Sequence, residues 1–317
     1  MILITGGSGF LGSNLIGKLD DRYLKVLVRD SRYINSCCEI IENTISSKVD
    51  YDGSLFDSVE CVVHCAARVH VMNDDLNDPL EAYREVNTAG TLNLARQAVN
   101  AGVKRFIFIS SIKVNGESTP INKPFKFDDD RSPEDPYGQS KSEAEEQLLE
   151  LAKETGLEVV IIRPTLVYGP GVKANFSALM NLVAKGVPLP FGCITDNKRS
   201  LVSVDNLVDL IITCIDHPKA VNEVFLVSDD YDVSTSEMVR KMATVLNKPQ
   251  TQISIPKFCY RLAGKVVGKE DVVHRLLGSL QVDISHTKQT LGWVPPQSID
   301  DGFRDTADAF MKTKLKG

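Results

Sequence analysis

The chain opens with a short apolar run that leads straight into a cluster of glycines, and this arrangement limits the fold more than any other feature. The run Met1–Thr5 is followed by Gly6-Gly7-Ser8-Gly9-Phe10-Leu11-Gly12 and by an amphipathic stretch over residues 14–19. Glycine permits unusual dihedral angles, close approach of the backbone to a ligand and tight packing of a helix on a strand. A helix that begins here presents its free N–H groups to an anion. The pattern therefore predicts a turn that binds the pyrophosphate of a dinucleotide, made by five residues: Gly6, Gly9, Phe10, Leu11 and Gly12.

Short apolar segments alternate with helical patterns through the first two thirds of the chain. Nearly continuous apolar strands, rich in β-branched and aromatic residues, are typical of a parallel sheet that is covered on both faces. We therefore expect an α/β fold with a Rossmann-type, doubly wound parallel sheet. The expected helices cover about residues 80–101, 137–155 and 206–215. The expected strands are Met1–Thr5, Leu24–Val28, Glu39–Glu42, Cys61–His64, Phe106–Ser110, Val159–Arg163 and Val224–Val227.

The rhythm of the sequence changes after Pro164. Prolines and glycines cluster over residues 170–192, and from Ser234 the pattern indicates a small helical cap that ends at Leu291-Gly292-Trp293. We expect two domains: a dinucleotide-binding domain over residues 1–165, with residues 200–230 returning to it, and a smaller C-terminal α/β substrate-binding domain over residues 166–199 and 231–317.

Composition excludes several classes of partner and site. The 317 residues include 36 Lys and Arg against 42 Asp and Glu, and the net charge of −6 gives no overall attraction to nucleic acid or anionic lipid. Seven cysteines without a CxxC pair and five scattered histidines indicate reduced core thiols and no metal site. No apolar stretch approaches the roughly 20 residues that span a bilayer, and no basic region precedes an apolar segment at the N-terminus. We expect a cytoplasmic protein with no nucleic-acid or membrane partner.

The residues after the second expected strand discriminate between two nicotinamide cofactors. Val28 is followed by Arg29 and Asp30. If Arg29 takes the discriminating position, a 2′-phosphate meets a cation, which favours NADP. If Asp30 takes it, the carboxylate accepts hydrogen bonds from the adenine ribose, which favours NAD. We favour NADP and keep NAD as the alternative.

A tyrosine and a lysine four residues apart open the helix expected after the long loop. Tyr137-Gly138-Gln139-Ser140-Lys141 places both side chains on one helix face. A tyrosine with a pKa near 10 is a poor base at neutral pH, and a cation within about 4–6 Å lowers the pKa of an acid by roughly 1–3 units. Ser110 and Ser111 end a strand, at the sheet edge where open α/β sheets bind ligands. We predict Ser111, Tyr137 and Lys141 as catalytic residues, the last two also in contact with the cofactor.

Together these motifs resemble the extended short-chain dehydrogenase/reductases of the nucleotide-sugar epimerase/dehydratase family. The resemblance runs nearly end to end and includes Val63-His64-Cys65-Ala66-Ala67, Val86–Thr91 and the segment from Arg163 to Gly171. It implies that Ser111 and Tyr137 contact the C4 oxygen of a UDP-linked sugar, with Lys141 on the cofactor side. It also implies two further sets of binding residues. Those at the cofactor are Ala66, Ala67, Asn87 and Pro164. Those at the substrate are Lys113, Asn175, Arg199 and Arg275, of which the last three lie near the substrate diphosphate.

The chain departs from the family pattern at two places. The usual Ser-Ser-x-x-Val-Tyr-Gly element has Asn115 in place of the tyrosine. A 4,6-dehydratase carries an Asp-Glu pair where this chain has Ile112 and Lys113, so the resemblance does not imply dehydration. The sequence of this segment resembles that of a bacterial surface-polysaccharide subgroup, which includes 4-ketoreductases.

Two reactions share the chemistry of such a C4 site. A 4-ketoreductase receives a ready-made ketone and exchanges reduced cofactor at each turnover. A 4-epimerase oxidises C4, lets the 4-keto sugar rotate and returns the hydride to its other face, and so retains NAD tightly. Arg29 and the subgroup resemblance favour reduction of a UDP-4-keto-6-deoxy-N-acetylhexosamine. The alternatives are a UDP-glucose or UDP-N-acetylglucosamine 4-epimerase and a non-catalytic dinucleotide-binding sensor. By analogy, the helices near 80–101 and 137–155 pair in a homodimer.

Overall fold

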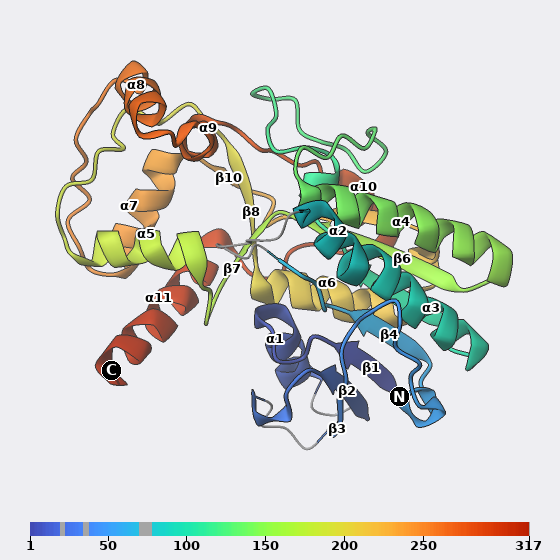
Figure 1. Cartoon of the computed structure of the whole chain (residues 1–317). Coiled ribbons are helices and arrows are strands. Elements are labelled where there is room, and N and C mark those ends of the chain that lie inside the picture. The colour runs from blue at the N-terminus through green and yellow to red at the C-terminus, as the bar shows by residue number, and fades with distance from the viewer. Residues whose placement is uncertain (20–22, 34–37, 70–77, 317) are drawn as a thin grey trace.

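Seven parallel strands form one sheet in the order β3-β2-β1-β4-β5-β6-β9 (Figure 1). The computed structural model describes residues 1–19, 23–33, 38–69 and 78–316. The sheet confirms the expected parallel α/β fold, and its strands lie within one residue of most expected bounds. They are β1 (Ile2–Thr5), β2 (Leu24–Val28), β3 (Glu39–Glu42), β4 (Cys61–His64), β5 (Arg105–Ile109), β6 (Glu158–Pro164) and β9 (Val224–Val227).

Helices cover both faces of this sheet, which is why its strands are apolar along their whole length. In β1, Ile2 and Ile4 join the core beneath α1 (Phe10–Lys18) and α6 (Val204–Asp216). Leu3 points the other way, into a core shared with α3 (Thr91–Asn100) and α4 (Pro136–Thr155). Successive side chains of a strand alternate between the faces, so a strand buried on both sides has no polar positions. Short 3₁₀ turns connect these elements: η1 (Ser31–Tyr33), η2 (Gly53–Phe56), η4 (Ile112–Val114) and η5 (Pro218–Ala220).

The single helix expected over residues 80–101 is interrupted. It consists of α2 (Pro79–Arg84), a π-helical segment η3 (Glu85–Gly90) and α3. Within η3, the Thr88 hydroxyl donates to the carbonyl of Ser140 in α4, and the Asn87 amide donates to the hydroxyl of the same serine. Hydrophobic periodicity does not distinguish an α-helix from a helix with one wider turn, and such wider turns are frequent at functional sites.

A three-stranded sheet with its own helices makes up the other part of the molecule. Its order is β10-β8-β7, and its core contains the stacked rings of Tyr168 and Phe176 and the nearby ring of Phe303. The strands are β7 (Leu166–Tyr168), β8 (Arg199–Ser203) and β10 (Asp232–Val233), and the helices are α5 (Ala174–Ala184), α7 (Thr235–Val245), α8 (Lys257–Val267), α9 (Glu270–Leu277) and α11 (Ile299–Lys316). Helix α10 (Ser285–Leu291) packs instead on the large sheet, where the Thr287 hydroxyl donates to the carbonyl of Leu226 in β9.

Two features of the chain after Pro164 differ from what the sequence predicts. The helical pattern does not end at Trp293, because α11 follows and packs Ile299, Phe303 and Ala307 into the small core. Within the segment 200–230, β8 pairs in the small sheet, whereas β9 pairs with β6 in the large one. The division into a cofactor domain and a substrate domain stays a prediction. None of the helices in the described parts of the chain is both long and apolar enough to cross a bilayer.

Candidate active site

The glycine turn and the loop after β4 meet at the point where the strand order reverses. β1 lies between β2 and β4, so the turn after β1 and the segment after β4 leave the sheet side by side. Gly6 has a φ of +72°, and a β-carbon there would stand 2.7 Å from the amide nitrogen of Ala66. The same amide nitrogen donates to the hydroxyl of Thr5 at 3.2 Å. Open α/β sheets bind ligands in the crevice at this reversal point.

The N-terminus of α1 opens into that crevice. Gly9 precedes the helix and provides no side-chain cap, and Gly12 packs against the carbonyl of Gly6, where a β-carbon would stand 2.4 Å away. Uncapped N–H groups at a helix start attract an anion, and the absence of β-carbons leaves room for it to approach the backbone. The predicted residues Gly6, Gly9, Phe10, Leu11 and Gly12 thus lie together and fit the pyrophosphate of a dinucleotide.

The two candidates for the adenine ribose lie at the end of β2. Asp30 accepts hydrogen bonds from the backbone N–H and the guanidinium of Arg32, and these bonds lower its pKa. Arg29 is exposed. Both side chains therefore lie at the expected end of β2, and this geometry accommodates either cofactor.

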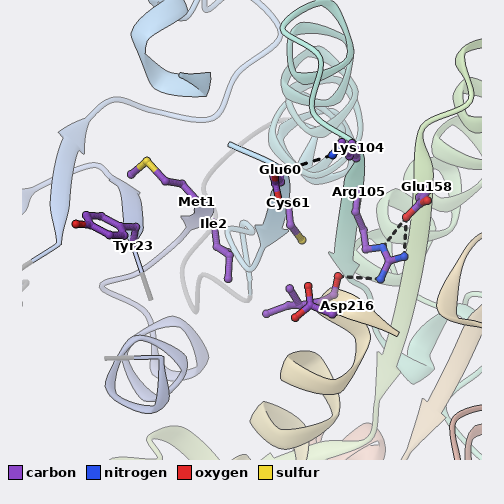
Figure 2. A pocket seen from close by; sticks show the side chains of 10 residues that line it. Met1, Ile2, Tyr23, Glu60, Cys61, Lys104, Arg105, Glu158 and Asp216 are labelled. Atoms are coloured by element: carbon purple, nitrogen blue, oxygen red, sulfur yellow. Dashed lines mark hydrogen bonds and ion pairs between the residues drawn. The ribbon is translucent and has the colours of Figure 1, made fainter. Parts of the chain in front are cut away.

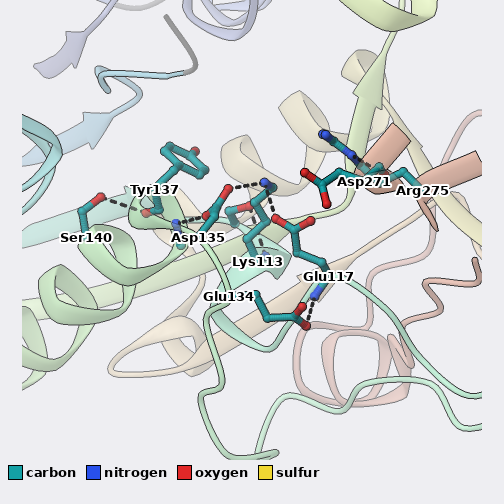
Figure 3. Close-up of polar contacts among 10 residues, drawn as sticks. Lys113, Glu117, Glu134, Asp135, Tyr137, Ser140, Asp271 and Arg275 are labelled. Atoms are coloured by element: carbon teal, nitrogen blue, oxygen red, sulfur yellow. Dashed lines mark hydrogen bonds and ion pairs between the residues drawn. The ribbon is translucent and has the colours of Figure 1, made fainter. Parts of the chain in front are cut away.

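Asp135 fixes the first turn of α4, which carries Tyr137. One carboxylate oxygen of Asp135 accepts from the backbone N–H of Gly138 at 2.6 Å, and the other accepts from the Lys113 ammonium (Figure 3). The Tyr137 ring packs edge to face on Tyr83, with centroids 6.2 Å apart. Asp135 is not among the predicted site residues, although aspartate followed by proline is a typical start signal of a helix.

Lys141 does not have the expected effect on Tyr137. Its Nζ donates to the carbonyl of Ile109 at 2.8 Å and lies over the Phe108 ring, 4.4 Å from the centroid. Burial lowers the pKa of Lys141 to about 7. The pKa of Tyr137 is raised, first by burial and then by the carboxylate of Asp135. A buried phenol beside a carboxylate favours the protonated form, so the prediction that Lys141 lowers the tyrosine pKa is wrong for this structure.

The two serines after β5 have different partners. The Ser110 hydroxyl donates to Glu145 at 2.5 Å, inside a buried ion pair between Glu145 and Arg163. Ser111 is partly exposed, and its hydroxyl accepts from the backbone N–H of Lys113 at 3.2 Å. Ser111 therefore keeps a donor available at the sheet edge, as a catalytic serine requires, while Ser110 stabilises the core beneath it.

Asn115 belongs to the same buried network. Its side-chain oxygen accepts from Arg163 at 3.0 Å, and Arg163 in turn holds Glu145 through two further hydrogen bonds. The family pattern has a tyrosine at this position. Here the shorter amide completes the environment of a buried arginine, which needs hydrogen-bond partners because a buried charge without them is costly.

Asn87 is fully buried and acts on the backbone. It accepts from the N–H of Arg68 at 2.8 Å and donates to the Arg68 carbonyl and to the Ser140 hydroxyl. It therefore fixes the segment that follows Ala66 and Ala67 and ties it to α4. Pro164, the remaining predicted cofactor residue, ends β6 at the same edge of the sheet.

Lys113 and the two predicted substrate arginines have different partners. Lys113 forms ion pairs with Asp135 and, at 2.7 Å, with Glu117. Arg199 donates to the backbone carbonyl of Arg275 at 2.8 Å, and its pKa is lowered first by burial and then by the nearby charge of Arg275. Within the described ranges, neither arginine forms an ion pair with a carboxylate, an arrangement suited to a ligand phosphate. Asn175 lies in α5, and its side chain is outside the described part.

A pocket of about 490 Å³ lies at the other end of the large sheet, where strands such as β1, β4 and β5 begin (Figure 2). Arg105 lies on its wall, but its guanidinium already donates to Glu158 and to the carbonyls of Cys214 and Ile215. These bonds tie β5 to β6 and to the end of α6. The pocket is therefore lined by structural contacts and lies away from Tyr137. Where the chain is described, no three His, Cys, Asp or Glu side chains form a group that would hold a metal ion.

Comparisons with known proteins agree with this geometry. The model of the "NAD dependent epimerase/dehydratase family" matches residues 2–228. A UDP-glucose 4-epimerase of Vibrio cholerae is 60% identical over 314 residues, which are 98% of this chain and 95% of that protein. The structure of a UDP-glucose 4-epimerase with UDP-glucose from Thermotoga maritima has a TM-score of 0.79 at 23% identity and 99% coverage of both chains. That of a UDP-glucuronic acid 4-epimerase from Bacillus cereus with NAD has a TM-score of 0.77 at 20% identity, covering 98% of this chain and 99% of that one. At these identities the structural likeness concerns the fold.

Proposed function

This chain belongs to the NAD dependent epimerase/dehydratase family, and from that premise we propose that it is a nucleotide-sugar 4-epimerase that inverts C4 of a UDP-linked hexose. The observation that carries the proposal is the 60% identity, over nearly the whole chain, to a UDP-glucose 4-epimerase. This identity supports the 4-epimerase, which is one of the alternatives left open by the sequence. The 4-ketoreductase that the sequence favoured is less well supported. The family is NAD-dependent, which supports NAD over the NADP that Arg29 favoured.

The residues at the sheet edge have the groups that this reaction needs. When bound, NAD supplies the acceptor and the donor for the hydride that C4 loses and regains. Tyr137 moves the proton at O4, and Ser111 orients O4 with its partly exposed hydroxyl. Lys141 lies one helical turn after Tyr137 on the same face of α4, and we assign it to the cofactor side.

The remaining residues are assigned to the phosphate groups of the cofactor and of the substrate and to the sugar. The uncapped start of α1 holds the cofactor pyrophosphate, and the paired cations Arg199 and Arg275 hold the diphosphate of the sugar nucleotide. We assign Lys113 to the sugar. We also retain the homodimer, in which α2, α3 and α4 of two copies pair.

One incubation separates the two reactions. Purified protein without added cofactor should interconvert UDP-glucose and UDP-galactose, or UDP-N-acetylglucosamine and UDP-N-acetylgalactosamine, and denaturation should release NAD in stoichiometric amount. Consumption of NADPH with a UDP-4-keto-6-deoxy-N-acetylhexosamine, without any interconversion, would restore the ketoreductase and overturn the proposal.

A further inference from the structure

Helix α8 presents its large apolar side chains to solvent. Its inner face packs on α9, where Gly264 lies against Val273. On the opposite face Phe258, Leu262 and Val266 follow one another at intervals of four residues and are 67%, 62% and 79% exposed. A surface helix of a globular protein normally turns such a row toward the core. This row therefore has no partner within the described chain.

A row of cations runs beside the apolar row. Lys257, Arg261 and Lys265 have the same four-residue spacing. Arg261 and Lys265 come three residues after Phe258 and Leu262, the spacing at which side chains are neighbours on a helix, so the two rows lie next to each other. Lys257 pairs with Asp196 across the cap. Arg261 and Lys265 form no ion pair within the described ranges, and the carboxylates of Glu270 and Asp271 come only after α8 has ended. We call these two rows the α8 face.

We propose that the α8 face binds the surface of an anionic lipid bilayer. An exposed apolar row flanked by Lys and Arg is the signature of a helix that lies in a membrane interface, with its apolar side chains among the acyl chains and its cations at the headgroups. Association of two copies through this face would bring like charges together, which argues against a dimer contact. The net charge of −6 does not reveal the face, because it averages a local cluster of cations with acidic residues elsewhere.

The position of α8 suits this role. Figure 1 shows α8 and α9 at the outer end of the small part of the molecule, away from the seven-stranded sheet. α9 carries Arg275, whose carbonyl accepts from Arg199, so one helix separates the α8 face from the candidate diphosphate residues. A bilayer on the α8 face would thus hold that end of the crevice near the headgroups and leave the cofactor sheet in solution.

Sedimentation with lipid vesicles tests the proposal independently of the enzymatic reaction. The full chain should sediment with phosphatidylcholine vesicles that contain one third phosphatidylglycerol, and not with pure phosphatidylcholine. Raising the salt from about 0.1 M to about 1 M shortens the screening length from about 10 Å to about 3 Å and should release the protein. Each cation near such a surface strengthens binding about fivefold, so Arg261→Glu with Lys265→Glu should weaken it at least about tenfold.

Matched variants distinguish binding through the α8 face from nonspecific adsorption to vesicles. Phe258→Glu with Leu262→Glu should abolish sedimentation, whereas Leu182→Glu, which alters an exposed leucine of α5, should leave it unchanged. Thermal unfolding confirms that each variant is folded. A single Phe258→Trp variant should show a blue shift of its emission with anionic vesicles only. Absence of binding by the unaltered chain, equal binding by all variants, or a loss of self-association in light scattering without a loss of vesicle binding would each overturn the proposal.

Discussion

Gly6 and Gly12 lie so close together that a β-carbon on Gly12 would stand 2.4 Å from the carbonyl oxygen of Gly6. The contact joins the turn after β1 to the first turn of α1 and sets the direction in which that helix presents its N–H groups. Both residues have to lack a side chain for the helix to start at this point.

We predict that Gly12→Ala weakens both the fold and the retention of NAD. The added methyl group has no space, and overpacking of this kind costs about 1–3 kcal/mol. Gly17→Ala is the matched control, because nothing lies within 4 Å of a β-carbon at this position of the same helix, and it should stabilise the protein by about 0.5–1 kcal/mol. Urea unfolding and the nucleotide released on denaturation measure the two effects. Equal behaviour of the two variants would contradict the prediction.

Tyr137→Phe should lower kcat by at least about 10²-fold, the low end for loss of a general acid–base group. The ring and its edge-to-face contact with Tyr83 remain, so the fold should be unchanged. Tyr231→Phe removes a hydroxyl that hydrogen-bonds Glu237 near the surface and should leave turnover intact. Steady-state kinetics with UDP-glucose provide the comparison. Turnover by the Tyr137 variant at the unaltered rate would remove this residue from the mechanism.

Arg199→Gln should raise KM for the sugar nucleotide by about 10- to 150-fold, the range for loss of a hydrogen bond to a charged group, and change kcat much less. Burial and the nearby Arg275 already disfavour the charge on Arg199, and a bound diphosphate relieves that repulsion. Arg240→Gln, on the exposed side of α7, is the control and should leave KM unchanged. A fall in kcat at constant KM would instead place Arg199 at the reacting carbon.

His64 should make the fold sensitive to acid. It is fully buried between the hydroxyls of Thr5 and Thr91, and burial lowers its pKa to about 3. Because the unfolded chain takes up a proton near pH 6.5 and the folded chain does not, the contribution of His64 to stability is complete above pH 6.5. It is lost as the pH falls toward 3, by up to about 1.4 kcal/mol for each pH unit.

Urea unfolding at a series of pH values measures this dependence. His64→Gln should be less stable at neutral pH and should lose less stability between pH 6.5 and 4 than the unaltered chain. His274→Gln, on exposed α9, should follow the unaltered chain. Parallel curves for the His64 variant and the unaltered chain would show that this histidine is not the acid-sensitive group.

The sequence predicts the large sheet well because burial on both faces leaves a simple signal. Even Glu39–Glu42, with carboxylates at both ends, is found as β3 at the edge of the sheet, where solvent accommodates them. The interruption of the helix after Pro79 is not predictable in this way. It depends on hydrogen bonds from Asn87 and Thr88 to α4, which is distant in the sequence.

The candidate site shows the same limit. The spacing of Tyr137 and Lys141 places both on one helix face, but the state of each group depends on what surrounds it. Lys141 is held by the carbonyl of Ile109, and Tyr137 lies near the carboxylate of Asp135. Burial and long-range partners of this kind appear only once the chain is folded, so a motif predicts which residues meet better than it predicts their charge.

The shared carboxylate of Asp135 links the two ends of the crevice. One of its oxygens secures the turn that carries Tyr137, and the other neutralises Lys113. A ligand that draws the Lys113 ammonium toward itself removes a positive charge that faces the Asp135 carboxylate. The phenol of Tyr137, two residues away, experiences this change. If Lys113 contacts the sugar as proposed, sugar recognition and the proton affinity of Tyr137 are coupled through Asp135, and substitutions that change one of these properties will change the other.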